Sequence, residues 1–222
     1  FPPTARSMIF VTDDGERSMN TYLGACVELG PEDVEADVVA QAKVTYFEGY
    51  LWDPPRAKEA ILDCARIAHE NGREMSMTLS DSFCVDRYRA EFLDLMRSGK
   101  VDIVFSNRQE ALSLYETDDF EEALNKIAKD CKIAAVTMSE NGAVILKGNE
   151  RHYVDAIKIN EVVDTTGAGD LFASGFLYGY TQGRSLEDCG KLGCLAAGIV
   201  IQQIGPRPMK SLSEAAKEAG LI

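Results

Sequence analysis

Short apolar runs rich in β-formers alternate with segments of helical period along most of the chain. The predicted strands lie at residues 44–47, 75–79, 101–105, 133–137, 143–146 and, as an edge strand, 151–154. The predicted helices span 31–42, 54–71, 87–96, 108–115, 120–129, 171–181, 186–202 and a segment beginning at 211. Strands that alternate with helices of this length pair in parallel and carry helices on both faces of the sheet. We therefore expect a single α/β domain over 1–222.

The first 25 residues depart from this alternation. An apolar run at 7–12 precedes Asp-Asp-Gly at 13–15, which is a hairpin signal, and the returning strand is expected at 17–22. This hairpin is a β element outside the main sheet. A second local choice stays open further along, because either Asp118 or Asp119 can cap the helix expected at 120–129.

The charge balance disfavours two classes of partner. The 222 residues contain 23 Lys and Arg against 36 Asp and Glu, which gives a formal net charge of −13. Such a surface repels nucleic-acid backbones and anionic lipids, so we expect neither nucleic acid nor a membrane as partner. The longest uncharged stretch, 192–206, is too short to span a bilayer. The six cysteines lack C-x-x-C spacing and are expected to be reduced thiols in a cytoplasmic protein.

The most unusual stretch is D-T-T-G-A-G-D at 164–170. A Gly-Ala-Gly turn that opens a helix aims unpaired backbone N–H groups outward, beside the positive end of the helix dipole. Without side chains at Gly167 and Gly169, a phosphate can approach the backbone closely. Asp170 places a carboxylate beside this anion hole, where a hydroxyl proton has to be removed as a phosphoryl group arrives. The alternative is an ordinary N-cap aspartate after a glycine turn.

A second candidate site is N-R-Q-E at 107–110, directly after the strand at 101–105. Asn107 and Glu110 share one face of an opening helix at the carboxyl end of a strand, where ligands bind open α/β sheets. The amide can hydrogen-bond a phosphate, and the carboxylate can hold Mg²⁺ through water. The same two residues can instead form a helix capping box.

Two further stretches are candidates for contacts with a nucleotide. T-M-S-E-N-G at 137–142 offers hydroxyls to a ribose or phosphate, or closes a hairpin into the next strand. A helix rich in small residues around Cys194 ends at Gly205-Pro206-Arg207-Pro208, and it can pack against a flat ligand or another helix. No G-x-x-x-x-G-K-[ST] sequence occurs, which excludes a Walker-type NTPase.

Taken in this order, these motifs resemble those of the pfkB, or ribokinase, family of carbohydrate and nucleoside kinases. The stretch 164–170 resembles the family's C-terminal signature, 107–110 its N-x-x-E motif, and 205–208 its loop after the adenine-side helix. The stretch 137–142 resembles its T-x-G-x-x-G turn, with Ser139 in place of the usual glycine. R-S-M-N-T-Y-L-G-A at 17–25 and L-S-D-S-F at 79–83 are similar to segments of adenosine kinases and their bacterial relatives.

The resemblance implies a ribokinase-like three-layer α/β/α fold with a mainly parallel central sheet, and residues 1–25 as part of a small β lid. It implies ATP-dependent phosphoryl transfer to a hydroxyl of a nucleoside, as in adenosine kinases. Alternatives are a sugar acceptor of the ribose, fructose or 2-keto-3-deoxygluconate type, or a non-catalytic nucleotide-binding module of the same fold. The expected cofactors are ATP and Mg²⁺, with K⁺ as a further candidate, and the expected state is a monomer or homodimer.

The resemblance also assigns roles to residues. Asp170 is the expected catalytic base, and it contacts the acceptor together with Asn20. The remaining assignments are the anion hole (Gly167, Ala168, Gly169), the ATP-binding residues (Asn107, Thr137, Ser139, Gly142, Cys194, Gly205), the Mg²⁺-binding pair (Glu110, Asn107) and a monovalent-cation ligand (Asp164).

One part of the family pattern does not occur in this sequence. The family's N-terminal portion carries a Gly-Gly signature and an aspartate that grips the acceptor's hydroxyls, and neither is found here. By the resemblance, Phe1 falls just before the lid's second set of strands. With no initial Met and no charged-then-apolar leader, we expect no signal peptide and a chain that begins inside a domain.

Overall fold

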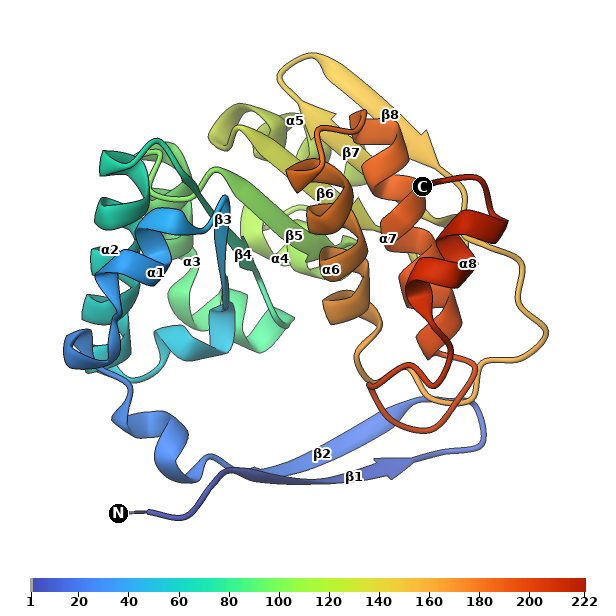
Figure 1. Ribbon diagram of the computed structural model, residues 1–222, viewed down its shortest axis with the longest axis horizontal. Helices are drawn as coiled ribbons and strands as arrows, with labels where there is room; N and C mark the ends of the chain where they lie inside the picture. Colours follow the sequence, from blue (N-terminus) through green and yellow to red (C-terminus); the bar gives the residue numbers. More distant parts are fainter. Residues whose placement is uncertain (1) are drawn as a thin grey trace. The chain divides into compact units, whose positions relative to one another are not determined.

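Six strands form the main sheet in the computed structural model, which describes residues 2–222 and leaves the expectation for Phe1 outside it. They are hydrogen-bonded in the order β3-β4-β5-β6-β7-β8 (Figure 1). Their bounds are β3 Val44–Glu48, β4 Glu74–Thr78, β5 Ile103–Asn107, β6 Ile133–Thr137, β7 Ala143–Lys147 and β8 Glu150–Val154.

The sheet is parallel where a helix connects its strands. β3 pairs with β4 and β4 with β5 in parallel, with Val44 opposite Glu74 and Ser76 opposite Ile103. The connections at 138–142 and 148–149 are too short for a crossover between parallel strands. The mainly parallel sheet expected from the sequence is therefore confirmed, with the exception confined to the last strands.

Eight α-helices are described, at α1 Ala36–Gln41, α2 Pro55–Glu70, α3 Ser82–Arg97, α4 Arg108–Tyr115, α5 Phe120–Asp130, α6 Ala168–Thr181, α7 Leu186–Val200 and α8 Leu212–Glu218. Three differ from the prediction. The helix expected at 171–181 begins at Ala168, directly after its N-cap Gly167, so Gly169 and Asp170 lie in its first turn. The helix expected at 31–42 is a 3₁₀ turn at Pro31–Asp33 followed by α1, because Val34 between them is extended. α3 begins before residue 87 because the Asp81 carboxylate caps it, accepting a hydrogen bond from the Cys84 amide at 2.6 Å.

The chain divides into two compact units. Unit 1 comprises Leu23–Val136, Leu146–Arg151 and residues up to Thr4, and unit 2 comprises Ala5–Tyr22, Thr137–Ile145 and His152–Ile222. No helix described in either unit is long and apolar enough to cross a bilayer.

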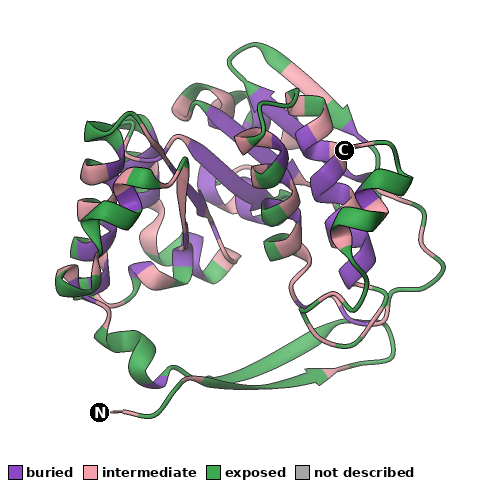
Figure 2. Cartoon of the chain, viewed as in Figure 1, coloured by how far each residue is buried: buried purple, intermediate pink, exposed green. Residues whose placement is uncertain are grey.

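The core of unit 1 lies between its parallel strands and the helices that connect them. Met75, Met77 and Ile103 on the strands and Phe92 on α3 are at most 1% exposed, and β4 and β5 are largely buried, whereas β3 at the edge of the sheet is mostly half-buried (Figure 2). α2 buries an apolar stripe at Ala57, Ala60, Ile61, Ala65 and Ala68. Burial of this stripe follows from its helical spacing.

In unit 2, α6 and α7 pack closely because small residues face each other. A Cβ at Gly175 would lie 2.4 Å from the Leu192 carbonyl oxygen, and one at Gly193 would lie 2.9 Å from the Phe172 ring. Glycine at both positions therefore lets the two backbones approach. Small residues of α7 thus serve helix packing, one of the two interpretations that the sequence left open.

The remaining β element of unit 2 is the predicted hairpin. β1 (Arg6–Val11) and β2 (Arg17–Tyr22) pair antiparallel, with Ile9 opposite Met19. Almost all of their side chains are exposed, as the green hairpin in Figure 2 shows. With so little apolar burial of its own, the hairpin depends on contacts at its turn for its position.

Candidate functional site

The stretch 164–170 forms the start of α6 in unit 2. Gly167 is the N-cap and lies in the left-handed region, with φ of 82°. A Cβ at this position would lie 2.6 Å from Cβ of Pro206. Both the backbone conformation and the close approach therefore require glycine here. The turn and the 205–208 loop touch at this point.

The first turn of α6 presents open backbone amides. The Ala168 amide donates to the Thr165 carbonyl at 3.2 Å, whereas the amides of Gly169 and Asp170 donate to no acceptor within residues 2–222. Gly169 is exposed, and a Cβ there would meet nothing within 4 Å. Two open donors thus lie on an exposed turn at the positive end of a helix, where an anion can bind.

Asp170 lies on this same exposed first turn. The residue belongs to the helix but is exposed to solvent. An incoming hydroxyl can therefore reach its carboxylate, which a group that accepts the hydroxyl proton requires. The arrangement matches the chemistry predicted from the sequence, while the catalytic role of Asp170 stays a prediction.

Asp164 is a buried carboxylate, 2% exposed, at the start of the loop. Its Oδ1 accepts from the Thr166 amide at 2.9 Å and from the Thr166 hydroxyl at 2.6 Å, and its Oδ2 accepts from the Gly205 amide at 2.8 Å. Burial alone raises the pKa of Asp164, but the bonds from Thr166 and Gly205 outweigh it and the pKa is lowered. Asp164 therefore ties the loop at 164–170 to the loop at 205–208. Its predicted role as a cation ligand would use the lone pair that remains on Oδ2.

The turn after β6 is tight. Gly142 has φ of 80°, and a Cβ there would lie 1.9 Å from the Val154 carbonyl oxygen. The Met138 amide donates to the Gly142 carbonyl at 2.7 Å, which closes the connection to β7. This stretch thus closes a hairpin, which was one of its two interpretations from the sequence. Contacts of Thr137, Ser139 and Gly142 with a nucleotide stay predictions. Cys194 on α7 is 7% exposed, and burial raises the pKa of its thiol to about 11.

In unit 1, Asn107 and Glu110 form a complete capping box at the start of α4. Asn107 Oδ1 accepts from the Glu110 amide at 2.8 Å, and the Glu110 carboxylate accepts from the Asn107 amide at 2.9 Å and its Nδ2 at 2.7 Å. Glu110 is 5% exposed, and its pKa is raised to about 7, chiefly by burial. The hydrogen bond from the Asn107 backbone opposes the rise, and the charges of Asp81 and Glu48 contribute to it.

These contacts bear on the predicted magnesium site. Both carboxylate oxygens of Glu110 are engaged by Asn107, so the pair suits an ion held through water more than one bound directly. No cluster of three or more His, Cys, Asp or Glu side chains placed to hold a metal occurs among residues 2–222.

A model of the family described as pfkB family carbohydrate kinase matches residues 2–212. The chain belongs to the pfkB family. The ribokinase-like α/β fold expected from the sequence is thereby confirmed.

Individual pfkB relatives carry both nucleoside and sugar names. The chain is 41% identical over 202 residues to an uncharacterized sugar kinase of Archaeoglobus fulgidus, covering 90% of this chain and 78% of that one. It matches the crystal structure of a "probable sugar kinase protein" from Rhizobium etli CFN 42 with a TM-score of 0.98 and 93% identity, over 99% of this chain and 67% of the other. It matches the crystal structure of adenosine kinase from Sinorhizobium meliloti with a TM-score of 0.97 and 75% identity, over 98% of this chain and 67% of the other.

The chain covers only part of the length of such relatives. Three curated pfkB-type matches are covered to 45%, 78% and 59% of their own length.

In this pfkB chain, Ser139 occupies the position where the family pattern has glycine. Ser139 lies in the left-handed region, with φ of 53°. A glycine adopts this conformation without strain, whereas serine keeps it at some cost. Ser139 therefore holds a backbone conformation that glycine adopts more easily.

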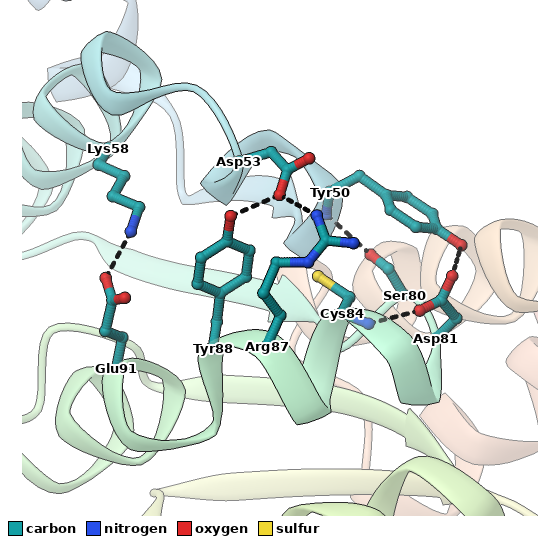
Figure 3. Close-up of polar contacts among 9 residues, drawn as sticks. All are labelled: Tyr50, Asp53, Lys58, Ser80, Asp81, Cys84, Arg87, Tyr88 and Glu91. Atoms are coloured by element: carbon teal, nitrogen blue, oxygen red, sulfur yellow. Dashed lines mark hydrogen bonds and ion pairs between the residues drawn. The ribbon is translucent and has the colours of Figure 1, made fainter. Parts of the chain in front are cut away.

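Four polar side chains near the carboxyl ends of β3 and β4 received no site role from the sequence, although two of them belong to the L-S-D-S-F stretch at 79–83. Tyr50 donates through its hydroxyl to Asp81 at 2.6 Å, and the Tyr50 amide donates to the Ser80 hydroxyl at 3.3 Å (Figure 3). The Ser80 hydroxyl in turn donates to Glu48 at 3.3 Å. Ser80 has φ of 71°, a strained value for a residue other than glycine. The sequence signal for a site residue here is the position of Ser80 in L-S-D-S-F, directly after a buried strand. All four lie in unit 1 with Glu110.

A second group in Figure 3 holds α3 to the turn after β3, through Asp53, and to α2, through Lys58. Asp53 accepts from Tyr88 and from Arg87, and Lys58 pairs with Glu91 at 2.7 Å. The Lys58 ammonium also lies 4.6 Å from the centre of the Tyr88 ring. These contacts are structural, since each charged group has a partner within the group.

The predicted acceptor residue Asn20 lies on β2, three positions after Arg17. Residues three apart on a strand point to opposite faces, so Asn20 is on the face opposite Arg17. Arg17 is the residue that contacts the site, because its guanidinium donates to the Thr165 hydroxyl at 2.9 Å.

Proposed function

We propose that this pfkB chain transfers a phosphoryl group from ATP to a hydroxyl of a nucleoside of the adenosine type, in the cytoplasm, as a monomer or homodimer. The observation that carries the proposal is the pair of open amides at Gly169 and Asp170, beside the exposed Asp170 carboxylate. A phosphoryl-transfer site needs positioning and charge stabilisation more than covalent chemistry, and this turn offers both.

The proposed steps use residues of the chain. The Asp170 carboxylate accepts the proton of the acceptor hydroxyl, whose oxygen then forms a bond to the γ-phosphorus while the bond to the β-γ bridging oxygen breaks and ADP leaves. The amides of Gly169 and Asp170 stabilise the charge on the transferred group. Mg²⁺, when bound, would neutralise phosphate charge, and Glu110 with Asn107 would hold it through water.

The nucleoside acceptor is supported by the similarity to the Sinorhizobium meliloti adenosine kinase. A sugar acceptor is the second candidate, since the Rhizobium etli and Archaeoglobus fulgidus relatives carry sugar-kinase names. A non-catalytic binding module is disfavoured by Asp170, because a binder has no need of a base beside its anion hole.

An acceptor screen tests the proposal. The chain is incubated with Mg-ATP and either adenosine, cytidine, ribose or fructose, and ADP release is measured. We expect release with adenosine at the lowest acceptor concentration. A preference for fructose would overturn the nucleoside assignment.

Thermal melting with and without Mg-ATP measures nucleotide binding separately from phosphoryl transfer. Mg-ATP at a hundred times its dissociation constant should add about 2.7 kcal/mol to the stability of the chain. A shift with Mg-ATP but no ADP release with any acceptor would favour the binding module over the kinase.

A further inference from the structure

The turn of the β1–β2 hairpin meets the loop at 164–170, the proposed phosphate-binding turn, inside unit 2 (Figure 1). Thr165 donates to the Gly15 carbonyl twice, from its amide at 3.2 Å and from its hydroxyl at 3.1 Å. The same hydroxyl accepts from the Arg17 guanidinium at 2.9 Å. One threonine therefore engages residues on both sides of position 16 in the hairpin turn.

The fit at this contact is close. Gly15 has φ of 80°, and a Cβ there would lie 2.8 Å from Cγ1 of Val162. No other residue fits Gly15 without displacing the loop or straining the turn. Since nearly all hairpin side chains are exposed, this contact is what gives the turn a fixed place.

Thr165 also leads directly into the anion hole. Its carbonyl accepts from the Ala168 amide at 3.2 Å, which forms the turn ahead of the open amides of Gly169 and Asp170. On its other side, Asp164 is held by Thr166 and Gly205. The backbone of Thr165 thus belongs to the phosphate-binding turn, while its side chain belongs to the hairpin contact.

We propose that Thr165 is a positioning residue that couples the hairpin to the phosphate-binding turn. A phosphate bound at Gly169 and Asp170 restrains the backbone of 165–168. The restrained Thr165 holds its bonds to Gly15 and Arg17 for a larger fraction of the time, so nucleotide binding orders the hairpin turn. The nucleotide-dependent part of this inference rests on the proposed function, whereas the contact itself does not.

Hydrogen exchange measured by mass spectrometry tests the coupling. The reporters are the amides of Thr12 and Gly15, which donate to Glu16 and Thr12 carbonyls at 2.9 Å within the turn. The variants are Thr165→Val, which removes the hydroxyl at nearly constant shape, and Thr165→Ser, which keeps it. Each is measured alone and with a non-hydrolysable Mg-ATP analogue.

Without nucleotide, we expect these amides to exchange about tenfold faster in Thr165→Val than in the wild type, because the hydroxyl carries two bonds, one of them to a charged donor. Thr165→Ser should exchange near the wild-type rate. With the analogue, exchange should slow further in the wild type and in Thr165→Ser but not in Thr165→Val.

Thr21→Val is the matched control. Its hydroxyl bonds Ser7 at 2.8 Å across the hairpin, at the end away from the turn. This variant should keep the nucleotide-dependent slowing at Thr12 and Gly15. Rates in Thr165→Val equal to those of the wild type without nucleotide would overturn the coupling. Absence of analogue binding to the wild type would instead refute the proposed function, so the two failures are distinguishable.

Discussion

At the scale of single residues, the Glu110 side chain both caps a helix and carries a carboxyl group with a raised pKa. The capping box predicted from N-x-x-E is present, with both carboxylate oxygens bonded to Asn107. The same box buries the carboxylate beside Asp81 and Glu48, which raises its pKa to about 7. A structural cap and a titratable group poised near neutral pH are thus one feature.

This burial predicts a pH-dependent stability. The pKa of Glu110 rises from 4.5 in the unfolded chain to about 7 in the folded one, so between these values the folded state keeps a proton that the unfolded state has lost. Folding stability should therefore fall as pH rises from 4.5 to 7, by about 3 kcal/mol from this group. Urea denaturation with EDTA at pH 4.5 and pH 8 measures the fall.

In Glu110→Gln, the free energy of unfolding should change much less between pH 4.5 and pH 8 than in the wild type, because an amide does not titrate. Glu59→Gln on the exposed face of α2 is the matched control and should keep the wild-type change. An equal fall in Glu110→Gln and the wild type would contradict the assignment of the buried proton.

At the scale of elements, local sequence signals located the strands and helices where capping chemistry was explicit. The prediction placed α4 at 108–115 and β2 at 17–22, the bounds that the structure has. It missed the start of α3, where Asp81 caps the helix and also accepts the Tyr50 hydroxyl from a turn 31 positions away in the sequence. That second contact is tertiary, and spacing along the chain does not encode it.

The start of α5 offers a test of capping, because the sequence allowed either Asp118 or Asp119. The structure selects Asp119, whose carboxylate accepts from the amides of Glu121 at 2.9 Å and Glu122 at 3.2 Å. Asp119→Ala should lower the free energy of unfolding by about 1 kcal/mol, as loss of an N-cap does. Asp118→Ala should leave it within about 0.5 kcal/mol. Urea midpoints of the two variants decide this, and equal losses would contradict the assignment.

At the scale of the whole molecule, the alternation of strands and helices predicted the fold class, and the family match over residues 2–212 agrees with it. The candidate site was predictable where one motif forms it, as in the turn at 164–170. It was not predictable where distant segments meet, as between Thr165 and the turn at Gly15, or between Asp164 and Gly205. These contacts depend on packing that short-range periodicity does not describe.

The proposed chemistry depends on Asp170. In ADP-release assays with adenosine and Mg-ATP, Asp170→Asn should lower turnover by at least about a hundredfold, because an amide cannot take the hydroxyl proton. Its Mg-ATP-dependent melting shift should match that of the wild type, since the open amides at Gly169 and 170 are backbone groups. Turnover by Asp170→Asn at the wild-type rate would contradict Asp170 as the base and, with it, the mechanism proposed for this chain.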